Sequence, residues 1–84
     1  MTRTIYVVYG ATGTYDDARD WPVIAFTDQD RATNYADNAT MMALRLLKQY
    51  DWHSIPAGAN NFDLEMQADS NGTSYSVASI ELEE

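Results

Sequence analysis

An uninterrupted run without Gly or Pro, from Asp28 to Tyr50, most constrains how this chain can fold. Its apolar residues recur at spacings of three and four, as on one buried face of a helix. They are Ala32, Tyr35, Ala36, Ala39, Ala43, Leu46, Leu47 and Tyr50. Thr27 or Asp28 can cap the start of this helix, because their side-chain oxygens accept hydrogen bonds from its first backbone N–H groups. In a chain of 84 residues, the economical way to cover one apolar helix face is to pack it on a sheet.

Four segments outside the helix have the composition of strands. Ile5–Tyr9 is β-branched or aromatic throughout and apolar on both faces, which predicts a central strand. Trp21–Phe26 contains Pro22, which cannot donate to a neighbouring strand, so this segment is predicted at an edge. Phe62–Ala68 alternates, with an apolar residue facing the core at every second position, and Tyr75–Leu82 is its predicted return strand.

Together these elements predict a single α+β domain over residues 1–84, in the order β-β-α-β-β. The predicted architecture is a four-stranded, mostly antiparallel sheet with one long helix packed on one face. Folding a chain this short hides only roughly 60–65 % of its unfolded surface, so a large buried cofactor cavity is not expected. The chain has no cysteine, which excludes disulfides and cysteine-ligated metal sites.

The last two predicted strands carry a turn signal and a phase change. Asn71-Gly72 is typical of a two-residue hairpin turn with positive φ. In the return strand, Tyr75 and Val77 are out of phase with Ile80 and Leu82. A bulge near Ala78-Ser79 would bring these four side chains to the same face, and we therefore expect one there.

Acidic residues dominate the charge and are unevenly distributed. Thirteen Asp and Glu face five Lys and Arg, for a net charge of −8, and no Lys or Arg follows Tyr50. Such a field repels phosphate backbones and attracts basic protein surfaces. Strand alternation predicts one acidic surface, made of Asp63, Glu65, Asp69, Glu81, Glu83 and Glu84. The alternative interpretation is that the charge only keeps the domain soluble.

Two further groups of residues are candidates for contacts with other molecules. The polar loop before the second strand combines aromatic and acidic side chains, and Tyr15, Asp16, Asp17 and Asp20 are predicted, with Asp63, Glu65 and Asp69, to bind a basic partner. The distal end of the helix is rich in apolar residues. There Met41, Leu44 and Tyr50 are predicted to mediate self-association as a homodimer, unless the loop over residues 51–61 covers them.

Catalytic, cofactor and metal sites are not predicted. Val8–Gly13 imitates a glycine loop for dinucleotides but has Asp16 where a third glycine is needed. The unfavoured alternative is a small metal-dependent enzyme, with a metal site built from Asp16, Asp17, Asp20 and His53. The longest apolar run near the start, Ile5–Tyr9, is too short for a membrane span or a secretory signal, so a cytoplasmic protein is predicted.

Two groups of residues carry a resemblance to a known family. They are Tyr6–Gly10, Thr12–Asp17, Asp20–Val23 and Ala25-Phe26 in the first half, and Phe62-Asp63, Met66, Gly72-Thr73 and Tyr75 in the second. With them, most of the chain resembles small proteins of bacteriophages and prophages. It departs from that family at Tyr15-Asp16-Asp17, where Tyr-Ser-Asp is usual.

The resemblance implies a phage accessory protein rather than an enzyme class. Combined with the acidic charge, it predicts a non-enzymatic protein that binds and modulates a host protein in the host cytoplasm, without binding nucleic acid or membranes. By analogy with other small acidic phage proteins, this would be an anti-CRISPR or other anti-defence inhibitor. A self-associating structural or assembly protein of the phage is the alternative.

Overall fold

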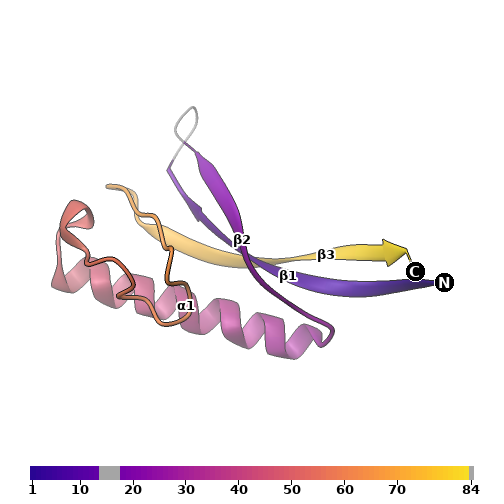
Figure 1. Cartoon of the computed structure of the whole chain (residues 1–84). Coiled ribbons are helices and arrows are strands. Elements are labelled where there is room, and N and C mark those ends of the chain that lie inside the picture. The colour runs from indigo at the N-terminus through magenta and orange to yellow at the C-terminus, as the bar shows by residue number, and fades with distance from the viewer. Residues whose placement is uncertain (14–17, 84) are drawn as a thin grey trace.

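The computed structural model describes residues 1–13 and 18–83, and it shows an α+β fold. Its elements are β1 (Thr2–Thr12), β2 (Arg19–Phe26), α1 (Gln29–Gln49), the short 3-10 helix η2 (Trp52–Ser54) and β3 (Thr73–Glu83). Figure 1 shows α1 lying along one face of the sheet, while the start of β1 and the end of β3 project together beyond it. We call Thr2–Ile5 with Ile80–Glu83 the projecting ribbon.

The sheet has three antiparallel strands in the order β2-β1-β3. The predicted central position of the first strand and edge position of the Pro22-containing strand are confirmed. β3 pairs with β1 along its whole length, from Thr2 opposite Glu83 to Thr12 opposite Thr73. β2 pairs only with Tyr6–Thr12 of β1, so the projecting ribbon consists of two strands alone.

The helix forms as its sequence predicts. Asp28 is the N-cap, and its carboxylate accepts hydrogen bonds from the backbone N–H groups of Asp30 and Arg31. The buried stripe of α1 is small: Ala32, Ala36, Ala39 and Ala43 are at most 3 % exposed. Small side chains let the helix backbone approach the sheet closely. Within residues 1–13 and 18–83, no helix is both long and apolar enough to cross a bilayer.

The predicted strand over residues 62–68 is wrong. Asn60, Asp63 and Asp69 each accept a hydrogen bond from the backbone N–H two residues further on, at 2.9, 3.3 and 2.8 Å. Backbone i to i+3 bonds from Asp63 to Asn60 and from Met66 to Asp63 tighten the same segment. These Asx turns compete with an extended conformation. As a result Leu64, predicted to face the core, is 68 % exposed, while Phe62 and Met66 do pack against it.

The predicted bulge near Ala78-Ser79 is also wrong, because the register between β1 and β3 is unbroken. Ile80 and Leu82 do not need to rejoin the phase of Tyr75 and Val77, since they lie on the opposite face of the sheet. The irregularity is in β2 instead, where Val23 is an extra residue between the pairs Val8–Ile24 and Tyr9–Pro22. This bulge brings Trp21, Val23 and Phe26 to the helix side despite their unequal spacing.

The positive φ predicted for Gly72 is confirmed, at 88°, but the residue ends the turn instead of lying at its centre, and the turn does not join two paired strands. Its N–H donates to the carbonyl of Asp69, and its own carbonyl accepts from the Thr12 hydroxyl at 2.6 Å.

We expect Gly72→Val to lower the free energy of unfolding by about 1–3 kcal/mol, because a β-branched residue tolerates positive φ poorly. Urea denaturation measures this, with the exposed neighbour substitution Ser70→Val as control; equal effects of the two changes would contradict the expectation.

Candidate functional site

The most tightly organised group of polar side chains surrounds Asp63, which is only 7 % exposed. Its Oδ2 accepts hydrogen bonds from the indole Nε1 of Trp21 at 2.8 Å and from the hydroxyl of Tyr75 at 2.9 Å. Its Oδ1 accepts from the backbone N–H of Glu65 at 3.3 Å. The prediction that Asp63 lies on an outer acidic surface is therefore wrong: the carboxylate ties β2, β3 and residues 60–66 together from inside.

The strands are shaped to admit this arrangement. Gly10 lies between Trp21 and Tyr75 in adjacent strands. A Cβ at Gly10 would stand 2.6 Å from ring atoms of Trp21, so only glycine lets the indole lie across β1 toward Asp63. From sequence, Gly10 was interpreted only as part of a glycine loop, because its contact with Trp21 depends on strand pairing that local patterns do not reveal.

Two tyrosines near Asp63 are held in their neutral form. Burial, followed by the hydrogen bond to Asp63 and the charges of Asp63 and Tyr35, raises the pKa of Tyr75 well above its ordinary value. Burial and the charge of Asp63 also raise the pKa of Tyr35, whose hydroxyl donates to the carbonyl of Phe62 at 2.6 Å. Both hydroxyls thus serve as hydrogen-bond donors in the packing of residues 60–66.

A second polar anchor, Asn60, attaches the same segment to the helix. Its side-chain amide donates to the carbonyl of Ala39 at 3.3 Å and contacts Sδ of Met66 at 3.4 Å. Asn60 is 1 % exposed. The sequence analysis treated this residue as loop; the only available signal was its spacing of three from Asp63.

The acids predicted to share one surface fall into two groups. Glu65 is exposed and Asp69 half-buried, next to the turn that precedes β3. Glu81 and Glu83 are exposed on the projecting ribbon. The length of β3, about 33 Å at a rise of ~3.3 Å per residue, separates the two groups. Glu84 lies outside the described residues.

The polar loop before β2 is described only in part. Tyr15, Asp16 and Asp17, predicted to contact a partner, lie outside the described residues. Asp20 is exposed on β2, directly opposite Ala11 of β1. Its neighbour Trp21 is half-buried and belongs to the Asp63 group instead.

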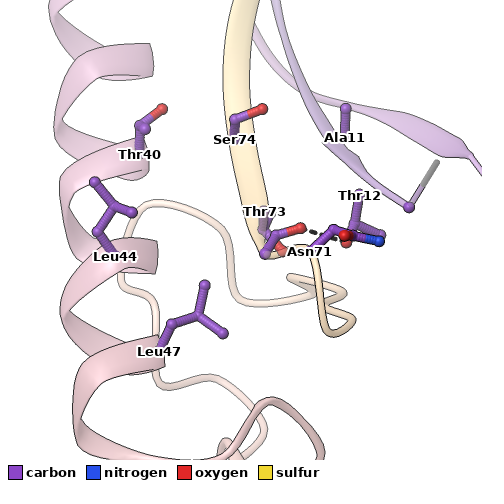
Figure 2. A pocket seen from close by; sticks show the side chains of 10 residues that line it. Ala11, Thr12, Thr40, Leu44, Leu47, Asn71, Thr73 and Ser74 are labelled. Atoms are coloured by element: carbon purple, nitrogen blue, oxygen red, sulfur yellow. Dashed lines mark hydrogen bonds between the residues drawn. The ribbon is translucent and has the colours of Figure 1, made fainter.

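The residues predicted for self-association are not brought to one hollow. Leu44 is 53 % exposed and lines a hollow of about 390 Å³ between α1 and the start of β3. Figure 2 shows Leu44 with Thr40 and Leu47 of α1 facing this hollow, opposite Thr73 and Ser74. Met41 is 56 % exposed and lines a different hollow, and Tyr50 is half-buried after the helix.

The hollow in Figure 2 offers methyl groups and hydroxyls but no titratable side chain among the described residues that line it. The Thr12 hydroxyl donates to the Gly72 carbonyl, and the Thr73 hydroxyl donates to the Gln67 carbonyl at 2.5 Å. The hydroxyl of Thr40 accepts from the backbone N–H of Tyr75 at 3.0 Å, which closes this end of the β3 edge. These three hydroxyls are thus engaged within the protein, and what they and the methyl groups leave in the hollow is mainly a surface for packing.

The alternative metal site gains no support from the visible residues. In the part of the chain that the structure describes, no three His, Asp or Glu side chains are grouped to hold a metal ion. His53 is exposed in η2, its ring against that of Trp52 with centroids 5.4 Å apart. Asp16 and Asp17 of that proposed site lie outside the described residues.

Comparison of the chain with family models, curated proteins and solved structures finds no match.

Removing the buried carboxylate leaves two donors, on Trp21 and Tyr75, without their acceptor. We expect Asp63→Ala to lower the free energy of unfolding by about 2–4 kcal/mol, because unpaired buried donors and lost charge-assisted bonds both cost stability. Glu65→Ala, an exposed carboxylate two residues away, is the control and should change stability by less than about 0.5 kcal/mol. Chemical denaturation of both variants decides; similar losses would mean that Asp63 does not hold the fold.

Stability should also depend on alkaline pH. Below the ordinary tyrosine pKa of 10.0, Tyr75 is neutral in both folded and unfolded chains, and its contribution is fully present. Above that pH the unfolded chain releases the proton while the folded chain retains it, so stability falls. We expect this fall to be steeper in the wild type than in Tyr75→Phe, by up to ~1.4 kcal/mol per pH unit. Denaturation between pH 9 and 11 measures both slopes, and equal slopes would contradict the expectation.

Proposed function

We propose that this chain is a non-enzymatic binding protein whose exposed acids engage a basic surface on a partner protein. The carrying observation is that these acids are turned outward with little internal neutralisation. Among residues 1–13 and 18–83, the one ion pair joins the ammonium group of Met1 to Glu83 at 3.7 Å, and both side chains are highly exposed. Exposed acids extend their field into solvent, where it accelerates encounter with basic surfaces.

Asp63 differs from the exposed acids, because its carboxylate is buried and bonded within the protein. Asp63 is engaged by Trp21, Tyr75 and the backbone of Glu65, so its role is to hold the fold. The exposed Glu65, Glu81 and Glu83 and the half-buried Asp69 are the acids that a partner could contact. Of these, Glu81 and Glu83 are the better candidates. The ion pair of Glu83 with the Met1 ammonium group is highly exposed, whereas the half-buried carboxylate of Asp69 accepts from the backbone N–H of Asn71.

The resemblance to small phage and prophage proteins gives the proposal its biological setting. On that resemblance, the chain is a phage-encoded accessory protein acting in the host cytoplasm, and the partner is a host protein. An anti-defence role, such as inhibition of a CRISPR effector with a basic nucleic-acid-binding surface, fits an acidic protein of this size.

The test is capture of host proteins from bacterial lysate, followed by kinetics with the purified captured protein. We expect the association rate to fall at least about tenfold between 50 and 500 mM salt, because screening shortens the reach of exposed charges. Glu81→Gln with Glu83→Gln should slow association at low salt and change dissociation little.

A matched control changes net charge equally at a distant surface. Thr33→Lys with Asn34→Lys adds two positive charges on exposed positions of α1. If this control slows association as much as the ribbon variant, only the overall charge matters and the ribbon is not the site. If neither salt nor any of these changes affects binding, the acids serve solubility and the proposal fails.

A further inference from the structure

The face of the sheet opposite α1, which we call the open face, is uncovered by any described helix or strand (Figure 1). Val8 and Tyr75 pack against the alanines of α1 and so define the helix side. Side chains alternate along a strand, which places Val7, Tyr9 and Ser76 on the open face. Ile80 and Leu82 also lie on the open face, so β3 is divided between two faces without a bulge.

One end of the open face carries large apolar side chains. Ile5 lies opposite Ile80, and Arg3 opposite Leu82, on the projecting ribbon. Ile80 is 41 % and Leu82 47 % exposed. Two adjacent branched side chains so exposed at the end of a strand leave an apolar protrusion in contact with water.

The other end of the same face is hollow. A cavity of about 510 Å³ opens there, lined by Tyr9, Ala11, Asp20, Ser76 and Ala78. Apart from Tyr9, the side chains around it are short. The protrusion and the hollow therefore lie at opposite ends of one surface, roughly 20 Å apart from Ile5 to Ala11 at a rise of ~3.3 Å per residue.

The charge of this face differs from that of the whole molecule. The described charged residues that alternation and register place on it are Arg3 at the apolar end and Asp20 at the hollow end. They sum to zero in a chain of net charge −8. Glu81 and Glu83 point to the helix side, because they alternate with Ile80 and Leu82. Two copies of this protein would meet least repulsion on the open face.

We infer that the open face binds a second copy of this chain, forming a two-fold symmetric dimer by sheet-on-sheet packing. The strands of the two copies run antiparallel, with the axis across the strands near Val7 and Ala78. This operation places Ile80 and Leu82 of each copy over the hollow beside Ser76 of the other. It also places Arg3 of each copy near Asp20 of the other.

Shape and charge are thus complementary under the same rotation, as a two-fold interface requires. A basic partner protein fits this face poorly, because it carries no net negative charge. Two strands about 33 Å long and the shorter β2, about 26 Å long, spaced about 4.8 Å apart, give a face of roughly 450 Å² in projection. Protruding side chains raise the accessible area toward the ~800 Å² per partner of a standard interface, so a weak dimer is expected.

Sedimentation of the full chain over a range from about 1 to 500 µM tests the dimer. We expect self-association with a Kd of roughly 10–100 µM, in keeping with the modest area. Added salt should strengthen it or leave it unchanged, because screening reduces repulsion between the acidic surfaces. Binding of a basic partner through Glu81 and Glu83 responds in the opposite direction, so failure of the proposed function and failure of this inference are distinguishable.

Two matched substitutions on neighbouring exposed positions locate the interface. Ala78→Arg places a large cation on the open face at the dimer axis and should weaken self-association at least tenfold. Ser79→Arg places the same side chain on the helix side of the same strand and should leave self-association unchanged. Circular dichroism and thermal unfolding of both variants establish that each is folded.

Each remaining outcome overturns the inference. A monomer at all concentrations means that the open face does not bind a second copy. A dimer that survives Ala78→Arg but is lost in Leu44→Arg places the interface at the distal end of α1, as the sequence analysis predicted. Equal effects of Ala78→Arg and Ser79→Arg would show that the interface uses the strand edge rather than the open face.

Discussion

The buried carboxylate of Asp63 is the interaction on which the arrangement of this small domain depends. It receives the indole of Trp21 from β2 and the hydroxyl of Tyr75 from β3, two strands that are separated by β1. Its own backbone and side chain also close turns within residues 60–66. A buried charge is expensive unless its oxygens are satisfied, and here each oxygen accepts at least one bond. The chain thereby uses one acid to fix a long segment without regular structure against the sheet.

The parts of the fold that local patterns determine could be predicted from the sequence. The helix, its cap at Asp28, the central strand and the Pro22-containing edge strand depend on neighbours a few residues away. The supposed fourth strand depends on partners that local patterns do not reveal. Phe62–Ala68 alternates like a strand, but Asp63 finds donors 42 and 12 residues distant, and Asn60 bonds to a helix carbonyl 21 residues away.

The bulge was misplaced because every apolar residue of β3 was assumed to face one core. The candidate site was predicted unevenly for the same reason: alternation placed Glu65 correctly outward and Asp63 incorrectly beside it.

One strand supplies two chemically different surfaces. In the second half of β3, Glu81 and Glu83 alternate with Ile80 and Leu82, so the acids lie on the helix side and the aliphatic residues on the open face. The phase change after Val77 creates this division, since the earlier residues Tyr75 and Val77 direct their apolar side chains toward α1. A protein with this strand can present a charged surface and an apolar surface at once. The two surfaces can serve different contacts without competing for the same side chains.

The pairing of β1 with β3 also has a consequence for the order in which the domain folds. β1 and β2 are consecutive in the chain, whereas the pairing of β1 with β3 spans the helix and the long segment over residues 50–72. Pairing of such distant residues carries a large loop-closure entropy and slows folding. It can begin where Thr12 meets Gly72 and Thr40 holds the backbone of Tyr75. We expect pairing to proceed from there toward Thr2 and Glu83, where the described residues supply no third strand or helix beside the ribbon. The ribbon that carries Glu81, Ile80 and Leu82 is accordingly the last part of the sheet to form and the first whose amides exchange with solvent.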